Sequence, residues 1–181
     1  MNPDEDRRAR MQFMFAFEGG SVFWSREISR RGSIEVLARL KSGHYLQQSP
    51  SATRKIHETN VDELEKLISD ANTRFIIPDD AEWPTQLNDL EAPPIALCLR
   101  GAADLRGLAL CSIAIVGARA ASNYGSRLAS ELALQLGERG WNVISGAAYG
   151  IDAAAHRGAL AYAGKSQTFQ SAYFQRPAST T

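Results

Sequence analysis

The stretch Ser145–Leu160, SGAAYGIDAAAHRGAL, holds the residues of this chain that are best suited to chemistry. Asp152 and His156 are four residues apart, so they would share one face of a helix. Such a pair could act as acid and base, but a hydrolase also needs a nucleophile or a metal set. Ser145 is close in sequence, yet SGAAYG is not a GxSxG nucleophile elbow. The alternative is that His156 hydrogen-bonds to Asp152 and the pair braces a loop.

Two glycine-rich segments could instead hold a phosphate. Gly117 follows an apolar strand in GARAASNYG, and the backbone amides there and at the start of the next helix can bind an anion. Arg119 adds a permanent, planar positive charge that suits phosphate. In the second segment, Gly146 and Gly150 flank a short loop that leads into a helix, and Tyr149 could stack on a base or sugar.

A nicotinamide dinucleotide is the obvious rival ligand for such loops. GARAASNYG lacks the GxGxxG spacing, and the next strand ends in Ser145-Gly146, where a carboxylate for the ribose hydroxyl is expected. These two departures argue against a dinucleotide, and we expect no cofactor.

The elements that position these loops are strands alternating with helices from residue 74 onward. RFIIP, IALCLRG, SIAIVGAR and WNVIS read as strands, and SIAIVGAR is apolar on both faces, as a central parallel strand should be. An amphipathic helix is predicted over 122–139, with Leu128, Leu132 and Leu136 on one face, and a last helix over 151–163. In parallel sheets, ligands bind beyond the carboxyl ends of the strands, where both glycine-rich loops lie.

The N-terminal part, residues 1–72, is predicted to be a small all-helical domain of the SAM or helix-hairpin-helix kind. Ser21 and Ser33 are candidate N-caps, and Gly32 and Gly43 are helix stops. A longer polar helix is predicted over 51–71, with Val61, Leu64, Leu67 and Ile68 on one face. Such a module could bind DNA through backbone amides or serve packing and oligomerisation.

Composition limits the function classes. The chain has 181 residues with 20 basic and 20 acidic side chains, so nucleic-acid binding would need a local patch. Cys98 and Cys111 lie in separate apolar segments, which favours buried free thiols in a reducing compartment over a zinc site. No run of about 18 apolar residues and no signal peptide is present, which predicts a cytoplasmic protein without a membrane partner.

Three segments in order, PDDAEWPTQLNDLEAPPIALCLRG, IAIVGARAASNYG and ISGAAYGIDAAAHRGAL, resemble the DprA/Smf family of DNA-processing proteins of natural transformation. The resemblance covers residues 7–164. It implies an α/β fold: a Rossmann-like parallel sheet, residues 73–164, preceded by the helical domain. It also implies single-stranded DNA binding without established catalysis, protection of incoming DNA, loading of a RecA-type recombinase, and a homodimer.

Residue by residue, the resemblance assigns the phosphate pocket to two loops. The binding residues it implies are Gly117, Ala118, Arg119, Ser145, Gly146, Ala148, Gly150 and Asp152. His156 matches the family's motif histidine and is expected to support the loop. Tyr149 stands where many members carry arginine, so a charge is exchanged for a stacking surface.

The resemblance ends after Gly164, where the family continues with further strand-helix units. This chain instead reads KSQTFQSAYFQRPASTT, a polar tail over 165–181 that is expected to be disordered. We therefore hypothesise a truncated member whose sheet lacks its later strands and leaves apolar surface uncovered. Three functional interpretations stay open: a DprA-like single-stranded DNA-binding protein, a nucleotide hydrolase that uses Asp152 and His156, and an inactive remnant.

Overall fold

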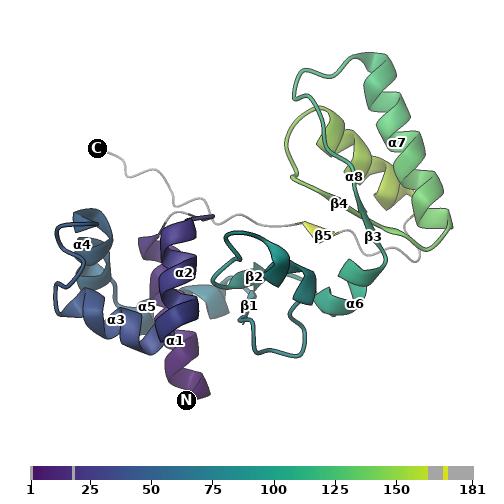
Figure 1. Cartoon of the computed structure of the whole chain (residues 1–181). Helices are drawn as coiled ribbons and strands as arrows, with labels where there is room; N and C mark the ends of the chain where they lie inside the picture. The colour runs from purple at the N-terminus through teal and green to yellow at the C-terminus, as the bar shows by residue number, and fades with distance from the viewer. Residues whose placement is uncertain (1, 18, 163–168, 171–181) are drawn as a thin grey trace. The chain divides into compact units, whose positions relative to one another are not determined.

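A computed structural model of the chain describes residues 2–17, 19–162 and 169–170, with no side chains described for the last pair. The chain divides between Leu99 and Arg100 into two compact units. We call the described residues up to Leu99 the N-terminal unit and those from Arg100 the C-terminal unit, and each is described by itself (Figure 1). Helices followed by a part with a parallel sheet confirm the predicted α/β class.

The N-terminal unit begins with a cluster of short helices. They are α1 (Pro3–Ala16), α2 (Val22–Arg31), α3 (Ser33–Lys41), α4 (Pro50–Glu58) and α5 (Val61–Asp70). Their core is aromatic and aliphatic, and the rings of Phe17 and Trp24 stack with centroids 4.2 Å apart. A short helix is marginal alone, so burial of these side chains is what keeps the cluster folded.

The predicted helix starts and stops hold in part. The Ser21 hydroxyl caps α2 by accepting from the Trp24 amide, and Gly32 ends α2, as predicted. Ser33 is not a cap, because Gly32 takes that position and the buried Ser33 hydroxyl donates to Asp6. The single helix predicted over 51–71 is wrong. It is two helices, and Asn60 caps the second one by accepting from the Asp62 amide.

Two strands complete the N-terminal unit. β1 (Arg74–Ile76) and β2 (Leu97–Leu99) pair antiparallel, with the 3-10 turn η1 (Thr85–Asp89) between them. The Arg7 guanidinium of α1 donates to the Phe75 carbonyl at 2.6 Å, and Arg10 donates to the Ile95 carbonyl at 2.9 Å. These bonds join the strand segment to the helices. The boundary read from the sequence at residue 72 marks the change from helices to strands, whereas the compact units divide at residue 99.

The C-terminal unit is a helix-covered parallel sheet. Its elements are α6 (Leu105–Leu110), β3 (Ser112–Ala114), α7 (Asn123–Glu138), β4 (Asn142–Ser145), α8 (Ile151–Ala161) and β5 (Phe169–Gln170). The strand order is β3-β4-β5, and both pairs are parallel. Helices α7 and α8 lie side by side (Figure 1). The predicted strand-helix-strand unit around α7 is confirmed.

Helix α7 buries its small residues rather than its leucines. Its buried side is formed by Ala129, Ala133 and Gly137, whereas Leu128 and Leu132 are 41% and 45% exposed. The helix predicted over 122–139 is confirmed, but its leucine face is not the buried one, since only Leu136 of the three leucines is half-buried. The reason is the close approach of α8, because small residues allow two helix backbones to come near each other while leucines would hold them apart.

The sheet differs from the predicted one at its edge. β3 pairs with β4 alone among the described strands, so it is an edge strand and not a central one, and Val116 just beyond it is 69% exposed. β5 lies inside the tail predicted to be disordered and corrects that prediction at Phe169–Gln170. Pairing with β4 uses backbone groups and needs no apolar side chains. The other tail residues, and Gly164, lie outside the described residues.

The two cysteines have different surroundings. Cys98 is buried, its sulfur lies 3.7 Å from that of Met14, and burial raises the pKa of its thiol to about 11. Cys111 is exposed, which corrects the prediction that both thiols are buried. It follows α6 at the beginning of the edge strand β3, where little protein covers it.

Because α7 and α8 are in close contact, we expect one added methyl group between them to lower stability strongly. A Cβ at Gly158 would lie 2.1 Å from the Ser130 carbonyl oxygen of α7. We expect Gly158→Ala to force the helices apart and to lower the stability of the C-terminal unit by about 1–3 kcal/mol. Native-state hydrogen exchange of α7 and α8 amides measures this. The neighbouring exposed Arg157→Ala is the control, and equal exchange in both variants would contradict the packing argument.

The different surroundings of the two thiols lead us to expect that a thiol reagent labels one of them selectively. A thiol with a pKa of about 11 has about one part in a thousand as thiolate at pH 8, and the thiolate is the reactive form. In native protein at pH 8, iodoacetamide should modify Cys111 and leave Cys98 intact, as read by peptide mass spectrometry. Cys111→Ser should abolish fast labelling and Cys98→Ser should preserve it. Fast modification of Cys98 in the folded chain would show that it is not buried.

Candidate phosphate-binding site

Two loops follow the parallel strands of the C-terminal unit. The first loop, residues 115–122, joins β3 to α7, and the second loop, residues 146–150, joins β4 to α8. Both leave the carboxyl ends of neighbouring parallel strands, so they lie at one edge of the sheet. All the site residues predicted from the sequence belong to these loops, to the last residue of β4, or to α8.

Hydrogen bonds join the two loops. The Gly117 amide donates to the Asp152 carboxylate at 3.2 Å, and the Ile151 amide donates to the Ala118 carbonyl at 3.2 Å. The Ser145 hydroxyl donates to the Ile115 carbonyl at 2.7 Å. The first loop is thus held along its first residues by the end of β4 and by the first turn of α8.

The glycines at the contact have no room for a side chain. A Cβ at Gly117 would lie 2.8 Å from the Ile151 side chain. Gly150 has φ +84°, and a Cβ there would lie 2.3 Å from the Ala118 carbonyl oxygen and 2.4 Å from that of Arg119. The lack of space therefore requires glycine at both positions, and the positive φ requires it at Gly150 as well.

Asp152 is buried in the first turn of α8 and is 6% exposed. One carboxylate oxygen accepts from Gly117, and the other would lie 3.0 Å from a Cβ at Gly146. A carboxylate at a helix N-terminus is stabilised by the helix dipole, and its hydrogen bond offsets the cost of burial. This geometry suits a brace between the loops, and it keeps the negative charge away from the surface.

In contrast to Asp152, Arg119 and Tyr149 are exposed at the surface. Arg119 is exposed and makes no ion pair within the described part of the chain, and Tyr149 is 86% exposed. The amides of Arg119, Ala148 and Tyr149 also have no hydrogen-bond partner among the described residues. A permanent cation, backbone N–H groups and an aromatic ring are therefore available on two loops that contact each other. Together they can hold a phosphate and one flat ring.

His156 lies one turn after Asp152 on α8, but the described contacts do not join the two side chains. Its Nε2 atom is buried and has no hydrogen-bond partner in the described structure. Ser145 is buried and its hydroxyl is committed to Ile115. A nucleophile hydrogen-bonded to a base, which a hydrolase needs, is thus not formed by these residues. Among the described residues no group of three or more His, Cys, Asp or Glu side chains could hold a metal ion.

The structure brings all the predicted residues to the two loops and the start of α8, but it divides them by exposure. Gly117, Ala118, Arg119, Gly146 and Tyr149 are exposed, whereas Ser145 and Asp152 are buried, with Ala148, Gly150 and His156 between. Sequence reasoning missed Ile151, whose side chain fills the space beside Gly117 and Gly125. The sequence feature that could have identified Ile151 is a branched apolar residue between a glycine and the carboxylate of the first helical turn.

The chain matches a family model described as DNA recombination-mediator protein A over residues 74–171. A Mycobacterium tuberculosis protein that bears the name DNA processing protein DprA is 38% identical over 143 residues, covering 71% of this chain and 36% of that protein. Protein Smf of Escherichia coli is 33% identical over 137 residues, covering 74% and 35%. The X-ray structure of DNA processing protein A from Streptococcus pneumoniae matches with a TM-score of 0.53 and 27% identity, covering 66% and 40%.

The chain belongs to the DprA/Smf family, because the family model covers more than half of it and relatives and a solved structure agree. The match to the family model extends to residue 171, beyond Gly164, where the resemblance was predicted to end. The chain spans about a third of the length of the curated relatives it matches. No described helix is long and apolar enough to span a membrane.

The contact between the loops predicts different effects for two glycines of similar φ. Gly140 has φ +82° and open space where a Cβ would be, so Gly140→Ala should cost only backbone strain of about 1–2 kcal/mol. Gly150→Ala adds a collision with two carbonyl groups of the first loop. We expect it to break the bonds of the Gly117 and Ile151 amides, which would then exchange rapidly with solvent in NMR experiments.

In Gly140→Ala the same two amides should stay protected. The loop contact would be disproved if Gly150→Ala left both amides as slow to exchange as Gly140→Ala does.

Proposed function

We propose that this chain binds single-stranded DNA by its phosphates at the two loops of the C-terminal unit. The observation that supports this most directly is Arg119, an exposed arginine that has no ion-pair partner among the described residues and lies on a loop whose backbone is fixed by Gly117 and Gly150. Arginine donates parallel hydrogen bonds to phosphate oxygens, and the neighbouring backbone N–H groups can donate to the same phosphate. Recognition of the backbone alone is independent of base sequence and weakens with salt.

Tyr149 gives this site a preference for unpaired strands. Its ring is 86% exposed beside the helix that begins at Ile151. An exposed ring can stack on a base that is not engaged in a duplex, whatever the base is. In this proposal the buried Ser145 and Asp152, together with His156, support the loops and do not touch DNA.

The cellular role that we propose follows family membership. The family model is described as a recombination-mediator protein, and relatives are named DNA processing proteins. We infer that the chain acts in the cytoplasm on DNA taken up in natural transformation. There it would protect single strands and help to load a RecA-type recombinase, without catalysis of its own. A homodimer belongs to the same proposal.

The experiment that tests the site is fluorescence anisotropy with a labelled single-stranded oligothymidylate across a salt series. Arg119→Ala should weaken binding by about tenfold or more at low salt and reduce the slope of log K against log salt by about one. Arg139→Ala, at the opposite end of α7, is the control, because within the described structure the side chain of this exposed arginine bonds only to the Gln135 carbonyl of its own helix. Equal affinity of both variants would refute the proposed site.

Stacking is tested separately at Tyr149. Tyr149→Ala should weaken binding by about fivefold or more, since stacking of a base on an aromatic ring contributes about 1–3 kcal/mol, and it should leave the salt slope unchanged. Tyr149→Phe keeps the ring and should bind as the unaltered chain does. Equal loss in both variants would mean that the hydroxyl, and not the ring, carries the contact.

A further inference from the structure

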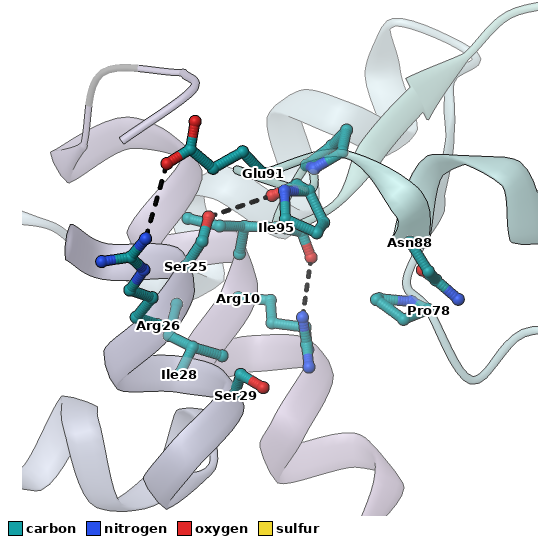
Figure 2. Close-up of a pocket in the computed structure, with 11 residues that line it drawn as sticks. Arg10, Ser25, Arg26, Ile28, Ser29, Pro78, Asn88, Glu91 and Ile95 are labelled. Carbon is teal, nitrogen blue, oxygen red and sulfur yellow. Dashed lines mark hydrogen bonds and ion pairs between the residues drawn. The ribbon is translucent and has the colours of Figure 1, made fainter. Parts of the chain in front are cut away.

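A second candidate binding site lies entirely within the N-terminal unit, in a cavity of about 360 Å³ that is partly open to solvent (Figure 2). One wall is α2, with Ser25, Arg26 and Ser29, and Arg10 of α1 lies beside it. The opposite wall comes from the chain between β1 and β2. The volume lies in the range of small-molecule sites and is sufficient for a mononucleotide.

Arg10 is held in place for recognition. Its Nε donates to the buried Asp6 carboxylate at 2.8 Å, and its Nη1 donates to the Ile95 carbonyl at 2.9 Å. The side chain is only 14% exposed, yet its Nη2 makes no hydrogen bond to the described residues. An arginine that is already fixed by two partners loses little conformational entropy when its remaining N–H groups bind a ligand.

The other polar groups of the cavity also offer hydrogen atoms. The Asn88 amide oxygen accepts from the Trp83 indole at 3.0 Å, which leaves the Asn88 NH₂ group as its open end. The Ser25 hydroxyl donates to the Pro93 carbonyl, while the Ser29 hydroxyl has no hydrogen-bond partner among the described residues. In Figure 2, Asn88 lies on the side of the cavity away from α2. Arg10 and Ser29 lie on the α1 and α2 side of the cavity and Asn88 lies on the other side, so each wall carries a residue with N–H or O–H groups.

The rim of the cavity carries a second arginine, Arg26. Arg26 and Glu91 form an exposed ion pair at 3.4 Å, with side chains 73% and 75% exposed. Such a pair is weak, so Arg26 can turn to a better acceptor at little cost. Glu91 is the one carboxylate among the described lining residues and it pairs with Arg26, while Arg10 pairs with Asp6.

The remaining lining is apolar and partly flat. Ile28, Pro78, Pro93 and Pro94 contribute side chains without hydrogen-bonding groups. A phosphate alone would not use these surfaces, but the sugar or base of a nucleotide would.

We propose that this cavity binds a phosphate group carried on a nucleoside-sized organic part. Arg10, Asn88 and Ser29 donate to the phosphate oxygens, Arg26 adds charge at the rim, and the prolines contact the organic part. The phosphate could come from a free mononucleotide or from a strand of DNA, and the chemistry at Arg10 and Asn88 is the same for both. The proposal does not depend on the function assigned to the loops of the other unit.

The test is isothermal titration of the full chain with deoxyadenosine 5′-monophosphate, inorganic phosphate and deoxyadenosine. The monophosphate should bind saturably, inorganic phosphate should compete with it, and deoxyadenosine should bind at least about tenfold more weakly. Asn88→Asp keeps the acceptor for Trp83 but places a negative charge in the cavity. It should weaken monophosphate binding by about tenfold or more, with the far-ultraviolet circular dichroism of the folded chain unchanged.

Controls separate this site from the loops. Arg26→Ala should weaken binding severalfold, while Arg54→Ala, an equally exposed arginine paired with Glu58 on α4, should not. Arg119→Ala should bind the monophosphate normally even if it loses DNA. In that variant, competition by a single-stranded oligothymidylate identifies a DNA strand as the source of the phosphate, and no competition identifies a free nucleotide. Deoxyadenosine binding equal to the monophosphate, or unchanged binding in Asn88→Asp, would overturn the proposal.

Discussion

The candidate site of the C-terminal unit depends on one hydrogen bond, from the Gly117 amide to the buried carboxylate of Asp152. A buried carboxylate without partners would be costly, and this one has an amide donor and the N-terminus of α8. Because the donor is in the first loop and the acceptor follows the second, the same interaction that stabilises the charge also fixes the loops to each other. The need to stabilise the buried charge of Asp152 therefore also determines how the two loops contact each other.

That constraint explains the glycines around it. For Asp152 to reach Gly117, α8 must begin against the first loop, and the Ile151 side chain then occupies the space where a side chain at residue 117 would lie. Gly150 turns the chain under the carbonyl groups of Ala118 and Arg119 at positive φ. The side chains of Arg119 and Tyr149, in contrast, are exposed on these loops.

Sequence patterns located the loops because the relevant signals are local. A strand followed by glycines and a helix start is visible in residues 113–125 and again in 142–156, and the caps of α2 are equally local. The face on which α7 packs is not local. Leu128 and Leu132 satisfy the helical period, yet α8 contacts the Ala129 side because Gly158 lets it approach there. The role of Ser145 is likewise hidden, since its partner is a backbone carbonyl thirty residues away.

Ion pairing explains how a chain of zero net charge can still attract an anion at the loops of the C-terminal unit. In the N-terminal unit, Arg7, Arg8, Arg31 and Arg39 are each paired with carboxylates, so their charges are largely cancelled within a few ångströms. Arg119 has no such partner in the described structure, and the nearby carboxylate of Asp152 is buried and committed to an amide. The field that a phosphate meets at the loops is therefore set by one arginine and several N–H groups, not by the total charge. A site of this kind neutralises few phosphates, so its salt dependence should be shallow compared with proteins that cover DNA with a basic face.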